Sequence, residues 1–167
     1  YELNGQTTML YQGIDSRIQA IQNAAYARVY GMQWSLDAQL GSRWILTTRM
    51  NLQKGEEELD NGAISPSRHA APYFGESSLS YEHNSWSGIL IHRFQGTKLH
   101  SQMAITERGK TELYALNAEN LTYAPSWGVW NLVGKYEIAD RGNILLKVEN
   151  LTDQRYRPYS SGISAPG

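Results

Sequence analysis

Residues 128–156, GVWNLVGKYEIADRGNILLKVENLTDQRY, contain two stretches in which apolar and polar side chains alternate. A period of two is typical of a β-strand with one apolar and one polar face. A turn at 139–142 separates the stretches, and in the second stretch Leu145 is the one residue that departs from the pattern. We therefore predict a β-hairpin whose apolar face contacts an apolar environment. Its apolar positions are Trp130, Leu132, Tyr136, Ile138, Ile144, Leu146 and Val148.

The same alternation recurs upstream. We expect strands over residues 30–40, 44–53, 73–82 and 86–95. Several of them reach the 9 to 11 residues that a tilted strand needs to cross a bilayer, whereas strands of soluble proteins more often have about 5 or 6. The pattern does not orient the strand at 86–95, because Ile89 and Ile91 oppose Leu90 and Phe94.

The connections between the expected strands alternate in length. Long polar segments at 54–72 and 97–126 alternate with short turns at 41–43, 83–85 and 139–142. Bacterial outer-membrane barrels have long loops on the outside and short turns on the periplasmic side. This rhythm favours a barrel, although a polar strand face suits both the lumen of a barrel and the water-exposed side of a soluble sandwich.

The N-terminal part is the least regular. An irregular strand near Thr7 would be the first of seven, which leaves two open edges. The spacing of Ile14, Ile18 and Ile21 also fits a short helix over residues 16–27, and both alternatives stay open.

Composition narrows the class of protein. The 167 residues carry a net charge of -1, which gives no electrostatic basis for binding nucleic acid, and the absence of Cys excludes disulfides and thiolate chemistry. The 11 Tyr and 5 Trp outnumber the 2 Phe. Such amphipathic rings are common at membrane–water interfaces and also on soluble binding surfaces. The mean hydropathy of -0.51 fits a soluble protein or a barrel.

One motif points to a family. Asn150, Leu151, Asp153 and Tyr156, with the loop at 157–167 that follows, closely resemble the penultimate strand of TonB-dependent outer-membrane receptors. In that family an Asn-Leu-aromatic-Asp-x-x-Tyr segment precedes a loop and the start of the closing strand. Thr152 replaces the aromatic residue. The segments at 23–33 and 65–72 are also similar to this family, with Gln33 where many members have Glu.

The resemblance implies an all-β fold: a segment of an antiparallel up-and-down transmembrane β-barrel with about 22 strands and a plugged lumen. Residues 1–167 would form the C-terminal part of this one barrel domain, while the plug domain and the final strand would lie outside the chain. The implied protein is an active transporter in the bacterial outer membrane, in contact with lipid. It would bind a scarce ligand, such as a ferric siderophore, haem, cobalamin or a glycan, at its extracellular loops.

The resemblance further implies that energy comes from the TonB complex, through parts of the protein not in this chain. It implies no cofactor and no covalent chemistry, so we expect no enzymatic activity. Two alternatives from other classes are a soluble all-β carbohydrate- or protein-binding module and an outer-membrane barrel enzyme. The enzyme would need a nucleophile and a base within reach of each other, and the sequence indicates neither.

Candidate ligand contacts lie in the expected loops. The segment at 65–72 resembles the place where a receptor loop re-enters the barrel, so Arg68 and His69 are predicted ligand-binding residues, with a structural loop anchor as the alternative. Tyr159 is a third predicted ligand-binding residue, because the resemblance implies that the loop at 151–167 faces outside and contacts ligand. No metal site is expected, because His69, His83, His92 and His100 lack metal-ligand spacing. The acidic run at 56–60 lacks the pattern of a calcium loop. Six charged residues are expected to face the lumen and to pair with one another or with a plug: Arg49, Arg93, Lys135, Glu137, Lys147 and Glu149.

Overall fold

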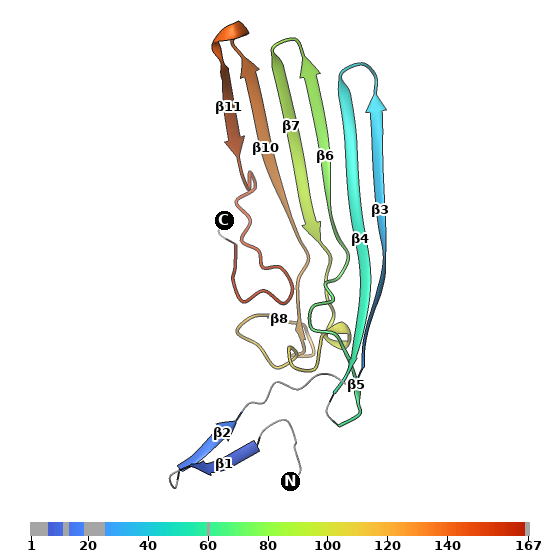
Figure 1. Cartoon of the computed structure of the whole chain (residues 1–167), viewed down its shortest axis with the longest axis vertical. Coiled ribbons are helices and arrows are strands. Elements are labelled where there is room, and N and C mark those ends of the chain that lie inside the picture. The colour runs from blue at the N-terminus through green and yellow to red at the C-terminus, as the bar shows by residue number, and fades with distance from the viewer. Residues whose placement is uncertain (1–6, 12–13, 19–25, 60, 166–167) are drawn as a thin grey trace.

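The main element of the computed structural model is a single antiparallel sheet (Figure 1). The structure describes residues 7–11, 14–18, 26–59 and 61–165. Six long strands follow one another in the order β11-β10-β7-β6-β4-β3, so each long strand pairs with its neighbours along the chain. They are β3 (Ala27–Leu40), β4 (Trp44–Glu58), β6 (Phe74–His83), β7 (Trp86–Gln95), β10 (Trp127–Glu137) and β11 (Asn143–Val148). The expected all-β, up-and-down arrangement is confirmed.

Short elements accompany the sheet. β5 (Ile64–Pro66) pairs with the end of β4, and β8 (Ala115–Leu116) pairs with β9 (Thr122–Tyr123). Two 3-10 turns, η1 and η2, cover His100–Gln102 and Ala139–Arg141. Among the described residues no helix is long and apolar enough to cross a membrane.

The N-terminal prediction was wrong in one respect. β1 (Thr7–Tyr11) and β2 (Ile14–Ile18) pair with each other in a separate two-stranded sheet, so no first strand of the main sheet begins near Thr7. Residues 7–18 lack the regular alternation of apolar and polar residues that gives a strand one apolar face. The possible helix at 16–27 is not formed at its two ends, where β2 includes residues 16–18 and β3 begins at Ala27. Residues 19–25 lie outside the described part.

The strands β3 and β4 are longer than expected, with 14 and 15 residues. β4 continues through Glu56–Glu58, where Ala27 faces Glu57 across the ladder. The loop expected at 54–72 is therefore shorter. The predicted end of this strand at residue 53 was wrong, because hydrogen bonding to β3 extends β4 into a charged segment. In that segment Lys54 Nζ and Glu56 Oε1 form an ion pair of 2.7 Å.

The register resolves the facing of β7. Leu90 lies directly across from Leu79 on one side and from Leu132 on the other, and residues directly opposite in a ladder share a face. Ile89 and Ile91 are thus on the opposite face. The same argument confirms the predicted hairpin of β10 and β11, in which Leu132 faces Val148 and Tyr136 faces Ile144.

One face of the sheet is apolar across all six strands, and we call it the outer face. Near the short turns it carries two aromatic pairs, Trp44–Tyr81 and Trp86–Tyr136, with ring centroids 4.6 and 4.5 Å apart. Such rows mark the interfacial girdles of transmembrane barrels. Its exposed apolar side chains are Tyr30, Met32, Trp34, Leu36, Leu40, Trp44, Leu52, Trp86, Trp130, Leu132, Ile144, Leu146 and Val148.

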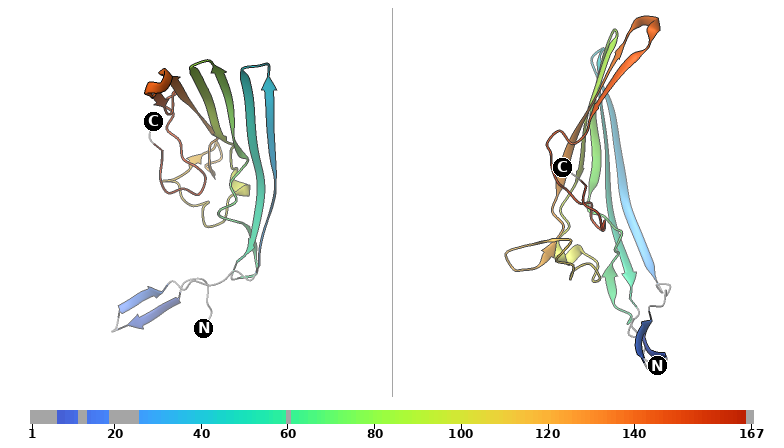
Figure 2. Two further views of the ribbon diagram at one scale, coloured as in Figure 1. Left: turned by 45° about the horizontal axis from the view of Figure 1, so that its top comes forward. Right: turned by 90° about the vertical axis from the view of Figure 1, so that its left-hand side faces the viewer.

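The two ends of the sheet differ, as the connection lengths predicted. The three short turns lie together at one end, and the long connections gather at the other (Figure 1). Figure 2 shows these connections on one side of the sheet wall. The buried apolar cluster of the described residues lies in them and consists of Met103, Tyr114, Ala124 and Tyr159. The loops thus contain a small core of their own.

Candidate functional site

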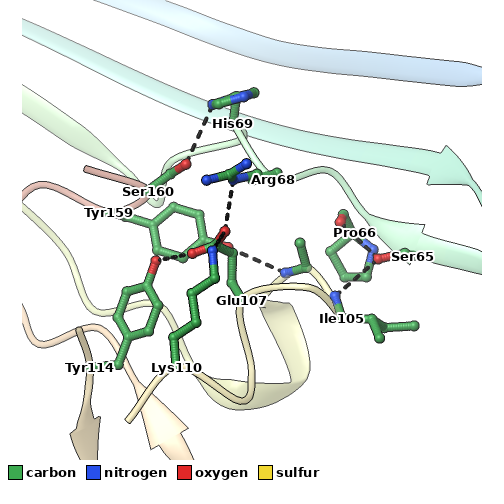
Figure 3. Close-up of polar contacts among 11 residues, drawn as sticks. Ser65, Pro66, Arg68, His69, Ile105, Glu107, Lys110, Tyr114, Tyr159 and Ser160 are labelled. Atoms are coloured by element: carbon green, nitrogen blue, oxygen red, sulfur yellow. Dashed lines mark hydrogen bonds and ion pairs between the residues drawn. The ribbon is translucent and has the colours of Figure 1, made fainter. Parts of the chain in front are cut away.

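Three connections meet around the buried carboxylate of Glu107: residues 61–73, 96–126 and 149–165 (Figure 3). Glu107 is only 1% exposed. Its Oε1 accepts Arg68 Nε at 2.7 Å and Lys110 Nζ at 2.6 Å, and its Oε2 accepts the hydroxyl of Tyr114 at 2.7 Å. A buried carboxylate needs such partners, because an unpaired buried charge is strongly destabilising. We call Glu107 with its partners Arg68, Lys110 and Tyr114 the Glu107 clamp, and the three connections that meet around it the loop cluster.

The electrostatics of the clamp follow from these contacts. Burial alone would raise the pKa of Glu107, but hydrogen bonds from Lys110 and Tyr114, with the charges of Lys110 and Arg68, bring it below the ordinary value. Burial and the bond to Glu107 raise the pKa of Tyr114 well above its usual range. Glu107 is thus ionised at neutral pH and Tyr114 is a protonated donor.

Tyr159 connects the C-terminal segment to the same cluster. Its hydroxyl accepts the Ala104 backbone N–H at 3.3 Å, and its own N–H donates to Gln95 Oε1 at 3.2 Å. Lys98 Nζ lies 5.2 Å from the centre of the Tyr159 ring and donates to the Ala70 carbonyl at 2.6 Å. Burial lowers the pKa of Lys98. The ring of Tyr159 is therefore fixed from both sides.

A glycine lets the loop that carries Arg68 lie close to the sheet. A Cβ on Gly55 would come within 2.8 Å of Ser67 Cβ and 3.0 Å of Ala70 Cβ. The backbone of Ser67 also donates to the Gly55 carbonyl at 2.8 Å. A side chain at position 55 would push this loop, and Arg68 with it, away from β4.

The structure brings the three predicted ligand-contact residues into one region. Arg68 binds Glu107, and Tyr159 lies beside Tyr114 with ring centroids 5.9 Å apart. His69 Nδ1 is 3.4 Å from Ser160 Oγ, next to Tyr159 (Figure 3). The segments at 65–72 and 157–165, distant in sequence, thus converge at the loop end of the sheet.

The residues of the 150–156 motif build a turn after β11. Asn150 has a positive φ of 51°. Its side-chain oxygen accepts a hydrogen bond from the Gln154 N–H at 3.1 Å, and its backbone carbonyl accepts one from the Asp153 N–H at 2.9 Å. Leu151 is partly exposed and donates its N–H to the Trp130 carbonyl at 2.7 Å. The ring of Tyr156 packs in a tilted arrangement against Trp127, with ring centroids 4.3 Å apart. The motif redirects the chain from the sheet toward the loop cluster.

A pocket of about 460 Å³ lies between the loops and the other face of the sheet, which we call the inner face. This volume is within the range of small-molecule sites. The sheet contributes Arg49, Asn51, Phe74, Glu76, Arg93, Gln95 and Trp127, and the loops contribute Ala71, Pro158 and Tyr159. The pocket is therefore bordered on one side by the loops that carry Ala71, Pro158 and Tyr159.

Of the six charged residues expected to face the lumen, four form two pairs with one another and Arg93 pairs with Glu76. Arg93 Nε binds Glu76 Oε2 at 2.6 Å, Lys135 binds Glu137 at 2.6 Å, and Lys147 binds Glu149 at 2.8 Å. Their side chains are about half exposed, so water screens each pair and its contribution to stability is small. The side chain of Arg49 makes no ion pair or hydrogen bond within the described part of the chain.

The histidines do not assemble a metal centre. His83 and His92 are on the outer face, where His92 stacks on Trp130 at 4.3 Å, and His100 Nδ1 lies 3.2 Å from the Thr122 carbonyl oxygen. In the regions that the structure describes, no group of three His, Cys, Asp or Glu residues could hold a metal ion.

Sequence reasoning missed the centre of the cluster. Glu107, Lys98 and Tyr114 lie in the long polar connection at 96–126, where no periodicity or motif distinguishes them from solvated residues. Only the fold shows that they are buried or partnered.

An apolar outer face, a polar inner face and loops gathered at one end define a segment of a β-barrel wall. A solved structure supports this class: the chain is similar to copper transporter OprC, with a TM-score of 0.64 and 17% sequence identity over 84% of this chain. This likeness shows the fold. The chain covers 22% of the length of OprC. No protein-family model and no curated protein sequence matches it.

Proposed function

We propose that this chain forms part of the wall and external loops of an outer-membrane β-barrel transporter that imports a scarce ligand. The observation that carries the proposal is the predominantly apolar outer face, with exposed apolar side chains on β3, β10 and β11 and aromatic pairs beside the short turns. A soluble protein has little use for so large an exposed apolar surface. In a barrel wall that face contacts lipid.

The rest of the transporter would lie outside this chain. Strands that complete the barrel would pair with the free edges of β3 and β11, because every backbone polar group in hydrocarbon needs a partner. A plug domain and the contact with a TonB complex belong to the same proposal. A 22-stranded barrel of which residues 1–167 form the C-terminal part is its most detailed form.

Ligand capture is assigned to the loop end. Arg68, His69 and Tyr159 are proposed contact residues, because they converge there and because Arg68 and His69 remain accessible to solvent. The ligand classes to test are ferric siderophores, haem, cobalamin and glycans. Copper joins the panel because the structural neighbour OprC is named a copper transporter.

The test is an uptake experiment with the complete gene. Cells that lack the gene are compared with complemented cells for accumulation of each ligand, with and without a protonophore that removes the energy source. We expect one ligand class to require the gene and the proton gradient. Gene-independent accumulation of every class would contradict the transport proposal, and uptake that persists with the protonophore would contradict its energised form.

Variants address the loop residues. His69→Ala leaves the Glu107 contacts in place, so a loss of uptake would reflect lost ligand contact rather than loop disorder. Arg141→Ala, in the exposed turn at the opposite end, is the matched control. We expect uptake at limiting ligand to fall several-fold for His69→Ala and to remain unchanged for Arg141→Ala. Equal uptake by both variants would remove His69 from the site.

A further inference from the structure

The pocket under the loops has a cationic end and an aromatic end. The strand register aligns Arg49 on β4, Glu76 on β6 and Arg93 on β7 in one row across the inner face. The next row toward the loops aligns Asn51, Phe74, Gln95 and Trp127. Tyr159 and Pro158 cover this second row from the loops. The polarity of the pocket therefore changes along its length.

The cationic end has more positive than negative charge. Glu76 is the one acidic residue among the described residues that line the pocket, and Arg93 Nε already binds it at 2.6 Å. The guanidinium of Arg49 and the terminal nitrogens of Arg93 make no hydrogen bond within the described residues. Both side chains are more than one-third exposed. A guanidinium presents a planar set of donors that matches a carboxylate.

The aromatic end offers flat apolar surface. Trp127 packs against the tilted ring of Tyr156, with ring centroids 4.3 Å apart, and Tyr159 contacts Gln95 and Lys98. Two buried donors at this end, Gln95 Nε2 and Trp127 Nε1, have no hydrogen-bond partner among the described residues. Buried polar groups are almost always satisfied, so unmatched donors in a pocket wall indicate a place where an acceptor can be gained by a small side-chain shift.

We propose that this pocket binds a small organic anion, with its carboxylate or a similar oxygen-bearing group at Arg49 and Arg93 and its apolar body against Trp127 and Tyr159. The inference deepens the proposed function and rests on it, since the ligand reaches the pocket through the external loops. A neutral ligand would leave the excess guanidinium without a partner, and a small inorganic anion would leave the aromatic end unused.

The competing occupant is an acidic side chain from another part of the complete protein. It would satisfy Arg49 permanently and leave no room for a ligand anion. The experiment must separate these two occupants, and it must use the complete protein because only the complete barrel contains both candidates.

The test measures binding of benzoate to the complete protein in lipid nanodiscs by ligand-observed NMR titration. Benzyl alcohol, which has the same ring without the charge, is the matched probe. Arg49→Gln removes the unpaired guanidinium, and Lys135→Gln removes a charge from the same face nearer the short turns as the matched variant. We expect saturable benzoate binding that weakens at least tenfold in Arg49→Gln and less than twofold in Lys135→Gln. Benzyl alcohol should bind more weakly than benzoate and be insensitive to both variants.

Three outcomes would overturn the inference. They are equal benzoate affinity in Arg49→Gln and the unmodified protein, no saturable benzoate binding to the unmodified protein, and a protein carboxylate on Arg49 that benzoate does not displace. Each leaves the proposed transporter standing if the protein inserts as a heat-modifiable barrel. Failure of the complete protein to insert would overturn the transporter and the anion site together.

Discussion

Replacing Glu107 by Gln should loosen the loop cluster without unfolding the sheet. The amide keeps one acceptor for Tyr114 but loses the charge that holds Arg68 and Lys110. Hydrogen bonds to a charged group contribute about 1.5 to 3 kcal/mol each. Arg68 and Lys110 are 49% and 30% exposed, so water replaces part of what they lose. We therefore expect a local loss of about 2 to 3 kcal/mol.

Hydrogen exchange of the complete protein measures this loss directly. The reporters are the amides of Glu107, Leu113 and Tyr114, which donate within the same loop at 2.9, 3.0 and 3.2 Å. At about 1.36 kcal/mol per factor of ten, their protection should fall about 30- to 160-fold, while amides of β4 and β6 stay unchanged. Glu112→Gln, an exposed change in the same loop, is the control. Unchanged protection in Glu107→Gln, or an equal loss in Glu112→Gln, would refute the clamp.

Three further predictions concern the pH response, the outer face and the loop contact. The Glu107 contacts should be fully present above about pH 4.5 and should be lost as the pH falls through the lower folded pKa of Glu107, because protonation removes the charge. Hydrogen exchange of the loop amides, corrected for intrinsic rates, should show this loss of protection. An equally large acid-induced loss of protection in Glu107→Gln would argue against it. Leu132→Lys should cost about 2 to 4 kcal/mol of barrel stability, because Leu132 lies near the middle of the outer face, whereas Val133→Lys on the inner face should cost less. Denaturant titration in bilayers measures both free energies of unfolding, and equal values for the two variants would count against the barrel. Gly55→Ala should cost about 1 to 3 kcal/mol through overpacking against the loop at 67–70; unchanged protease resistance of that loop would contradict the close contact.

The fold was largely predictable because its signal is local. Alternation at 128–148 and 30–53 fixes strands, and the side chains report their own facing, as with Leu132 and Val133. β7 could not be oriented because both of its faces carry apolar residues, and only pairing with β6 and β10 decides between Ile89 and Leu90. The end of β4 was misjudged because hydrogen bonds from β3 override the loop-like composition of residues 54–58.

The site was predictable only in part, because it depends on long-range contacts. The resemblance at 65–72 indicated Arg68 and His69, and the loop after β11 indicated Tyr159. Glu107, which connects Arg68 to Tyr114, lies 39 positions from Arg68 in an irregular segment. No local pattern marks a polar residue that becomes buried through partners from other loops.

The central claim is that the apolar face of the sheet contacts lipid, and spin labels test it most directly. Single cysteines can be placed in turn at positions 129–136 of a cysteine-free form of the complete protein in bilayers; this chain itself contains no Cys. Collision rates with oxygen, which partitions into lipid, and with a water-soluble nickel complex are then compared. We predict high oxygen accessibility at 130, 132, 134 and 136 and high nickel accessibility, or burial from both, at 129, 131, 133 and 135. Nickel accessibility at 130, 132, 134 and 136 equal to that of the odd positions would contradict the membrane account.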